Sequence, residues 1–172
     1  NCWQAPSLHH EMSSCEPCYT WVFFHSWQLA DRPRFLEGMY SLFAGASSQQ
    51  TYTVCETRGG ITGVTPCLPS VWLARLAVLD DQIRDDELHL LRLTPLAWLR
   101  TDKPARFDSM PTEFGPVSLT VQLGAAGREL QVTFAPKFRT APKRLLLHVP
   151  PVKGLAAIRF NGQTISWDGK AT

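Results

Sequence analysis

The sequence changes character near residue 93, and this change constrains the fold more than any other feature. Residues 1–92 carry apolar residues at helical spacing, all five cysteines and four of the five histidines, whereas residues 93–172 carry short alternating segments and no cysteine. The charge changes too, from 6 Lys/Arg against 10 Asp/Glu before residue 93 to 11 against 5 after it. Helices and strands segregated along a chain are typical of α+β proteins. We therefore expect a helical segment over 1–92 and an antiparallel β-sheet or sandwich over 93–172.

Three helices are expected in the first region. The first begins near Glu16-Pro17 and runs to Leu29, since proline is tolerated in a first helical turn. The second is capped by Asp31 and stops at Gly45, so these two helices form a hairpin. The third opens at Pro69-Ser70 and ends at Asp80-Asp81. The first helix is apolar on most sides, which suggests neighbours from another part of a parent polypeptide or from a partner chain.

From Leu88 onward the hydrophobic period is two, which favours strands. Leu96–Leu99 has the pattern of a short turn or helix, and Asn161-Gly162 is a strong signal for a two-residue hairpin turn. The expected strands are Leu88–Leu93, Val117–Leu123, Glu129–Phe134, Arg144–Val149 and the segment Ala156–Trp167.

Several functional classes fit the sequence poorly. The longest apolar runs are far shorter than the roughly 18 residues of a membrane span, so no span is expected. Lys and Arg in the basic half stand singly between apolar residues, which argues against nucleic-acid binding. The chain starts without Met or a secretory signal, which suggests a processed protein or a piece of a larger one. The compartment stays open, with a secreted or periplasmic location favoured.

Cys15 and Cys18 have Cys-x-x-Cys spacing, with His9 and His10 before them and Cys55 and Cys67 further on, so a zinc site is one interpretation. No second Cys-x-x-Cys or spaced histidine pair follows. Buried thiols or one local disulfide explain these residues better, and a redox pair lacks a thioredoxin-like βαβ context. We therefore expect neither a metal nor a cofactor.

Glu56 is the candidate catalytic residue. It follows a strand-like stretch and stands beside Arg58 and a glycine-rich loop, where a carboxylate can be exposed in a cleft. The alternative is that Glu56 pairs with Arg58 or caps a turn. Trp3 and Tyr52 lie outside strong helical periodicity, so they are better candidates for sugar stacking than the other aromatic residues, while His10 is a further substrate-binding candidate.

The order of these segments resembles the closing part of six-hairpin (α/α)-toroid glycoside hydrolases. The similarity lies in a helical hairpin, the segment Tyr52–Gly60, a last helix and Leu93–Leu99, followed by Pro111–Leu119 and the late Phe160-Asn161-Gly162 turn, which are similar to an appended β-sandwich. The resemblance implies that Glu56 is a general base, with Arg58 and Tyr52 orienting substrate. The chain supplies only the last hairpins of such a toroid, and no candidate for the partner general acid, expected roughly 6.5–9.5 Å away, stands out.

The sequence thus predicts the C-terminal portion of a carbohydrate-active enzyme, most simply a glycoside hydrolase acting on an oligo- or polysaccharide and incomplete in this chain. A polysaccharide lyase is a less favoured form of the same hypothesis, using Tyr52 with His9 or His10 as bases and Arg58 as the charge neutraliser. The alternative is a non-catalytic carbohydrate-binding or structural module, and a zinc-stabilised interaction domain is the third possibility.

Overall fold

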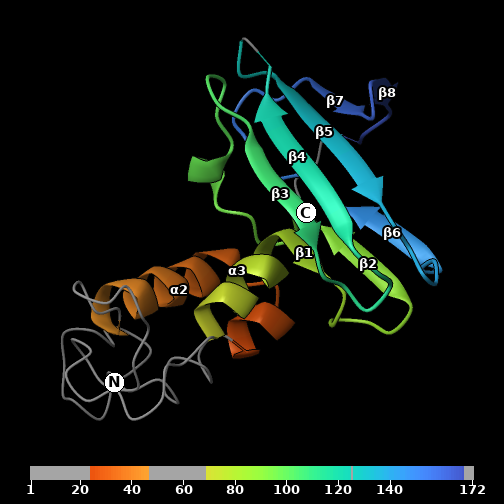
Figure 1. The fold of residues 1–172 in the computed structure, drawn as a ribbon. Coiled ribbons are helices and arrows are strands. Elements are labelled where there is room, and N and C mark those ends of the chain that lie inside the picture. Colours follow the sequence, from red (N-terminus) through yellow and green to blue (C-terminus); the bar gives the residue numbers. More distant parts are fainter. Residues whose placement is uncertain (1–23, 47–68, 125, 169–172) are drawn as a thin grey trace. The chain divides into compact units, whose positions relative to one another are not determined.

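The computed structural model describes residues 24–46, 69–124 and 126–168, and the protein has an α+β fold (Figure 1). The chain divides after Leu76 into two compact units. This division comes earlier than the boundary expected at residue 92, because two short strands before residue 92 belong to the sheet-bearing unit. The candidate residues Trp3, His10, Tyr52, Glu56 and Arg58 lie outside the described residues.

The helical unit follows the caps and spacing of its sequence. Residues 24–28 are helical, α2 spans Arg32–Ala46, and α3 spans Pro69–Val78. Asp31 caps α2, because its Oδ1 accepts the backbone N–H of Arg34 over 3.2 Å. Phe35 and Met39, one turn apart, are fully buried. The predicted start of the second helix after Asp31 and of the third at Pro69 are confirmed.

Aromatic rings pack within this unit. The Phe24 ring contacts Trp72 at a centroid distance of 5.1 Å, and it meets Trp27 edge to face at 6.1 Å. Trp27 is buried, as expected for an aromatic residue on an apolar helix face.

Among the described residues, no helix is long and apolar enough to cross a membrane.

The second unit holds two sheets. The smaller sheet has the order β1-β2-β6, and the larger has the order β3-β4-β5-β7-β8. Their bounds are Leu79–Asp80 (β1), Glu87–Leu90 (β2), Ala105–Met110 (β3), Val117–Leu123 (β4), Glu129–Pro136 (β5), Arg144–Leu147 (β6), Ala157–Phe160 (β7) and Gln163–Ile165 (β8). A 3-10 turn, Leu96–Trp98, precedes β3, as the pattern of Leu96–Leu99 predicts.

The expectation of purely antiparallel pairing is wrong at two places. β2 pairs with β6 in parallel, and β5 pairs with β7 in parallel, so both sheets are mixed. The third helix also ends at Val78 rather than at the acidic pair, because Leu79–Asp80 pairs with β2 as β1. β3 was not expected, since its sequence carries no clean alternation.

The larger sheet has one apolar and one polar face. Val117, Leu119 and Val121 of β4 are buried on the apolar face, and polar residues alternate with them. The same alternation runs through β5. A sheet with one wet face is the usual solution for strands of alternating sequence. The other buried residues of this face are Leu130, Val132, Phe134 and Ile158.

The β7–β8 hairpin forms at the predicted site. Asn161 and Gly162 have φ of 47° and 81°, and Phe160 pairs with Gln163 across them. Positive φ at both central positions is the requirement that makes Asn-Gly a hairpin signal. The hairpin prediction is therefore confirmed.

A buried aspartate joins the two sheets. Asp81, next to β1, accepts the backbone N–H of Glu113 through Oδ2 over 2.7 Å, and Glu113 lies in the turn between β3 and β4. Figure 1 shows the smaller sheet beside the end of the larger one where β3 finishes and β4 begins. This contact fixes the β3–β4 turn against the smaller sheet.

Candidate functional site

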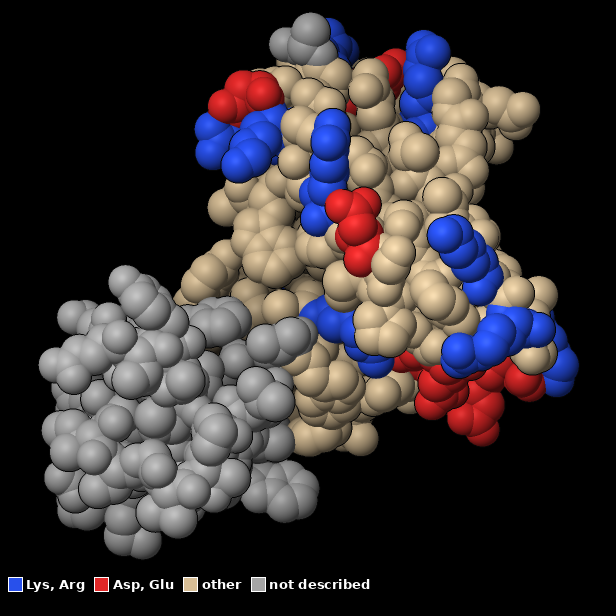
Figure 2. Space-filling model, viewed as in Figure 1, with Lys and Arg blue, Asp and Glu red and all other residues tan. Residues whose placement is uncertain are grey.

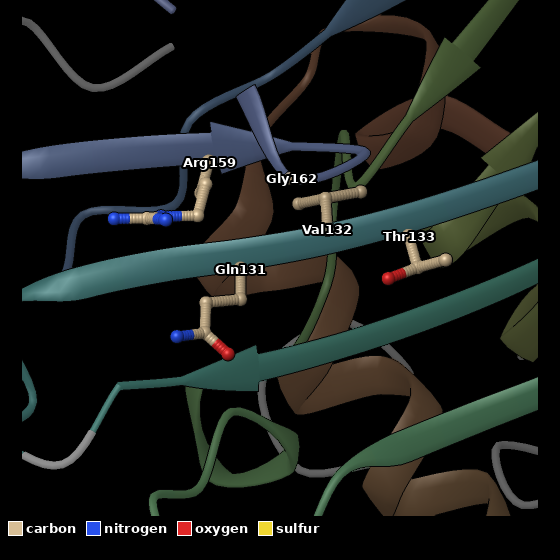
Figure 3. Close-up of a pocket in the computed structure, with 5 residues that line it drawn as sticks. All are labelled: Gln131, Val132, Thr133, Arg159 and Gly162. Carbon is tan, nitrogen blue, oxygen red and sulfur yellow. The ribbon is translucent and has the colours of Figure 1, made fainter. Parts of the chain in front are cut away.

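A shallow hollow of about 190 Å³ lies on the polar face of the larger sheet. It is lined by Gln131, Val132 and Thr133 of β5, by Arg159 of β7 and by Gly162 of the β7–β8 turn. Figure 3 shows Gln131, Thr133 and Arg159 projecting from neighbouring strands on the same side, with Val132 on the opposite side of β5. The hollow is therefore a polar site open to solvent.

Strand register explains why these side chains meet. Gln131 is paired with Arg159 across the parallel β5–β7 ladder. On the other side, Gln131 pairs with Gln122 of β4, and Thr133 pairs with Thr120. Side chains directly opposite one another lie on the same face of a sheet. The hollow thus stands in a continuous polar area that spans three strands.

Glu129 holds the polar groups of the hollow in place. Gln131 Nε2 donates to Glu129 Oε1 over 2.7 Å, and Arg159 Nε lies 3.4 Å from Glu129 Oε2. The hydrogen bond from Gln131 is the main cause that lowers the pKa of Glu129; burial opposes this effect, and the Arg159 charge adds to it. Glu129 therefore stays a carboxylate at neutral pH, and its two oxygens fix the amide and the guanidinium.

The fixed network leaves hydrogen-bonding capacity for a ligand. A glutamine whose Nε2 is engaged retains an acceptor oxygen, a threonine hydroxyl both donates and accepts, and an arginine bound through Nε still has two terminal nitrogens. The negative charge of the Glu129 carboxylate and the positive charge of the Arg159 guanidinium cancel locally. This combination suits a neutral ligand with several hydroxyl groups better than an isolated ion.

On the face drawn in Figure 2, the basic residues of the described part of the chain do not form a continuous stripe. Figure 2 shows Lys and Arg side chains mostly scattered over this view and separated by uncharged residues, with acidic side chains gathered mainly near the lower end of the unit. Lys143, just before β6, donates through Nζ to Asp86 Oδ2 over 2.7 Å, which raises the pKa of Lys143. A track of phosphate-binding side chains would need a continuous basic stripe.

A second polar cluster lies on the smaller sheet. His89 Nδ1 lies 2.8 Å from His148 Nε2, and His89 Nε2 lies 2.9 Å from Glu87 Oε2. Glu87 Oε1 in turn accepts a hydrogen bond from Arg144 over 2.8 Å. In the contact between the two rings one nitrogen donates and the other accepts, and the tautomer of each ring decides which. Within the described ranges, no three His, Cys, Asp or Glu side chains are arranged to hold a metal ion.

Asp80 and Arg92 form a buried ion pair beside this cluster. Arg92 Nη1 lies 3.2 Å from Asp80 Oδ2, and the exposed fractions of the two side chains are 8% and 0%. Asp80 Oδ1 also accepts the backbone N–H groups of Gln82 and Ile83. Burial lowers the pKa of Arg92, and Asp80 partly offsets that effect. Asp80 thus orders the turn between β1 and β2 while it pairs with Arg92, which is a structural role.

The residues of the hollow cannot be brought together from the sequence alone. The alternation in Glu129–Phe134 predicts that Glu129, Gln131 and Thr133 share one face, but nothing local connects them to Arg159. The period-two pattern puts His89 in a strand, but nothing local connects it to His148, which is 59 positions away in the chain.

The comparisons with known proteins give no assignment. No protein-family model matches the chain, and neither the curated proteins nor the solved structures contain a match to it.

Proposed function

We propose that this chain is the C-terminal portion of a carbohydrate-active enzyme, and that its sheet-bearing unit, residues 77–172, binds saccharide without catalysing its cleavage. The observation that carries the binding role is the network in which Glu129 orients Gln131 and Arg159 beside Thr133 on an open polar face. Sugar hydroxyls both donate and accept hydrogen bonds, so they match this mixture of groups.

The expected affinity is modest. A net hydrogen bond is worth about 1 kcal/mol, and charged partners give somewhat more. Three or four such bonds amount to about −4 kcal/mol, which corresponds to a Kd on the order of 1 mM. The hollow is shallow and none of its lining residues is aromatic, so it lacks a stacking platform that would raise this affinity. Binding of this strength suits a module that keeps an enzyme near a polymer with many repeated sites.

The binding role is tested by affinity electrophoresis in gels that contain dextran, xylan or polygalacturonate. Wild-type protein should be retarded by at least one of these polymers, and Arg159→Met should lose most of the retardation. Arg139→Met is the matched control, because Arg139 is an exposed arginine that does not line the hollow. Equal retardation of wild type and Arg159→Met, or none with any polymer, would contradict the binding role.

The catalytic part of the proposal rests on the resemblance to toroid glycoside hydrolases. In it, Glu56 is the general base, with Arg58 and Tyr52 as substrate-orienting residues and Trp3 and His10 as further contacts. The remaining hairpins and the general acid come from the rest of the parent polypeptide or from a partner chain. Glu56→Gln in the parent protein should abolish turnover and leave saccharide binding intact. Unchanged turnover would favour the non-catalytic module for the whole chain.

A further inference from the structure

The side chain of Asn161 takes the place of a strand residue. Its Oδ1 accepts the backbone N–H of Phe134 over 2.7 Å, and its Nδ2 donates to the carbonyl oxygen of Phe134 over 3.1 Å. The backbone N–H of Asn161 also donates to Val132, over 2.9 Å. The carboxamide thus extends the β5–β7 ladder by one residue and fastens the hairpin turn to β5. We name these two side-chain bonds the Asn161 clasp.

The clasp needs an amide. One side-chain atom must accept and the other must donate, and a carboxylate can only accept. An aspartate at this position would direct an oxygen at the Phe134 carbonyl oxygen instead of a donor. The partly buried carbonyl oxygen of Phe134 would then lose its donor. A buried polar group without a partner lowers the stability of the fold.

The same residue is chemically placed for deamidation. Asn161 is exposed and is followed by Gly162, whose backbone nitrogen carries no neighbouring side chain to hinder attack on the Asn161 carboxamide. A Cβ atom added to Gly162 would meet no atom within 4 Å, so the space around the turn is open. Access for water and freedom of the following residue both favour the reaction.

We propose that Asn161 is a deamidation site whose rate is controlled by the Asn161 clasp and whose reaction permanently opens that clasp. The backbone nitrogen of Gly162 attacks the carboxamide carbon, forming a C–N bond. The bond to the side-chain nitrogen breaks, that nitrogen leaves as ammonia, and the proton of the attacking nitrogen is transferred in the process. Water then hydrolyses either carbonyl of the cyclic imide and gives aspartate or isoaspartate.

Two consequences follow from the geometry. While both clasp bonds hold, the carboxamide carbon is tied to β5, so reaction requires local opening of the turn. After reaction the carboxylate cannot donate to Phe134, and isoaspartate also inserts an extra backbone atom between Phe160 and Gln163. Gly162 lines the hollow, so the change loosens one wall of the candidate saccharide site.

The test is peptide mapping by mass spectrometry after incubation of the whole chain at mildly alkaline pH, folded and in urea. Asparagine occurs only at positions 1 and 161, so the two sites fall in separate peptides. The Asn161 peptide should gain a single mass unit in both samples, at least tenfold more slowly in the folded one. Equal rates would remove the control by the clasp, and a folded protein that never reacts while the unfolded chain converts fully would remove the site.

Two variants test the structural consequence. Asn161→Asp should exchange the backbone amide hydrogen of Phe134 at least tenfold faster than wild type, and aged wild-type protein should show the same change. Gly162→Ala is the control, because its methyl group slows attack while Asn161 keeps its amide. Aged Gly162→Ala should retain the exchange rate of the fresh variant. An Asn161→Asp protein with wild-type exchange at Phe134 would overturn the proposal that deamidation opens the clasp.

Discussion

Gly115 occupies a position in the β3–β4 turn that no other residue can take without displacing backbone atoms. Its φ is +126°, and a Cβ added to it would lie 2.6 Å from the carbonyl oxygen of Lys137 and 2.9 Å from the backbone nitrogen of Arg139. Neither atom can retreat freely. Lys137 N–H donates to Pro116 and Arg139 N–H donates to Phe114, over 2.8 and 2.7 Å. Gly115→Ala should therefore strain the turn and the end of β5 together.

The cost can be worked from two contributions. Forcing an extra carbon into a tightly packed site costs about 1–3 kcal/mol, and an unfavourable backbone conformation costs about 1–3 kcal/mol more. The expected loss in the free energy of unfolding is thus about 2–6 kcal/mol. Gly154→Ala is the matched control, because Gly154 has φ of +77° but a Cβ there would meet nothing within 4 Å. Its loss should be about 1 kcal/mol, from backbone strain alone.

The assay is urea unfolding followed by hydrogen exchange of peptides from β4 and β5, so that the helical unit does not contribute to the signal. Gly115→Ala should lower the urea midpoint clearly more than Gly154→Ala, with a similar slope for the two variants. A Gly115→Ala protein that is no less stable than Gly154→Ala would refute the close backbone contact and the turn geometry built on it.

Three further changes have expected outcomes. Arg92→Met should lower the free energy of unfolding by about 3–5 kcal/mol, because it leaves the Asp80 carboxylate buried without its guanidinium. Adding Asp80→Asn should recover part of that loss in a double-mutant cycle measured by urea unfolding. Full additivity of the two changes would argue against the ion pair. Because the pKa of Glu129 is lowered in the folded protein, its contribution to stability is complete above the unfolded-state pKa and is lost as pH falls through the folded-state pKa. The Tm advantage of wild type over Glu129→Gln should therefore shrink between neutral pH and about pH 3. A Tm difference that stays constant over this range would contradict the prediction. His148→Phe should lower the free energy of unfolding by about 1–3 kcal/mol, because it leaves a buried ring nitrogen of His89 without that partner, and unchanged stability in urea would show that the bond contributes nothing.

Local signals predicted the starts of α2 and α3 and most of the strands, whereas the expected helix start near Glu16 lies outside the described residues. Asp31 and Pro69 mark real helix starts, because capping and first-turn preferences act within a few residues. Asn161-Gly162 marks a real hairpin for the same reason, since positive φ at two positions restricts the choice of residues. Alternation also located β4 and β5 within a few residues.

Pairing between distant strands could not be predicted in this way. Glu87 of β2 pairs with Arg144 of β6, 57 positions later, and this contact makes the smaller sheet mixed. Leu79 continues the apolar pattern of the preceding helix, so its place in β1 is visible only once β2 lies beside it. Short strands of this kind are defined by their partner more than by their own sequence.

The candidate site also combines residues that local sequence patterns predict with a residue that only strand pairing brings near. Periodicity places Gln131 and Thr133 on one face of β5, but Arg159 reaches them only through the parallel β5–β7 pairing. The resemblance to toroid glycoside hydrolases points to Glu56 and the glycine-rich loop, which lie outside the described residues. The proposed binding role is therefore supported by tertiary geometry, and the proposed catalytic role by sequence order.

The most direct test of saccharide binding is a chemical-shift titration of the whole chain with soluble oligosaccharides from dextran, xylan and polygalacturonate. We expect the side-chain amide of Gln131 and the backbone amides of Thr133, Arg159 and Gly162 to shift together with one millimolar Kd. Arg159→Met should abolish the response. Shifts confined to other surfaces, or none at any accessible concentration, would show that the polar face of the larger sheet is only solvated and does not bind saccharide.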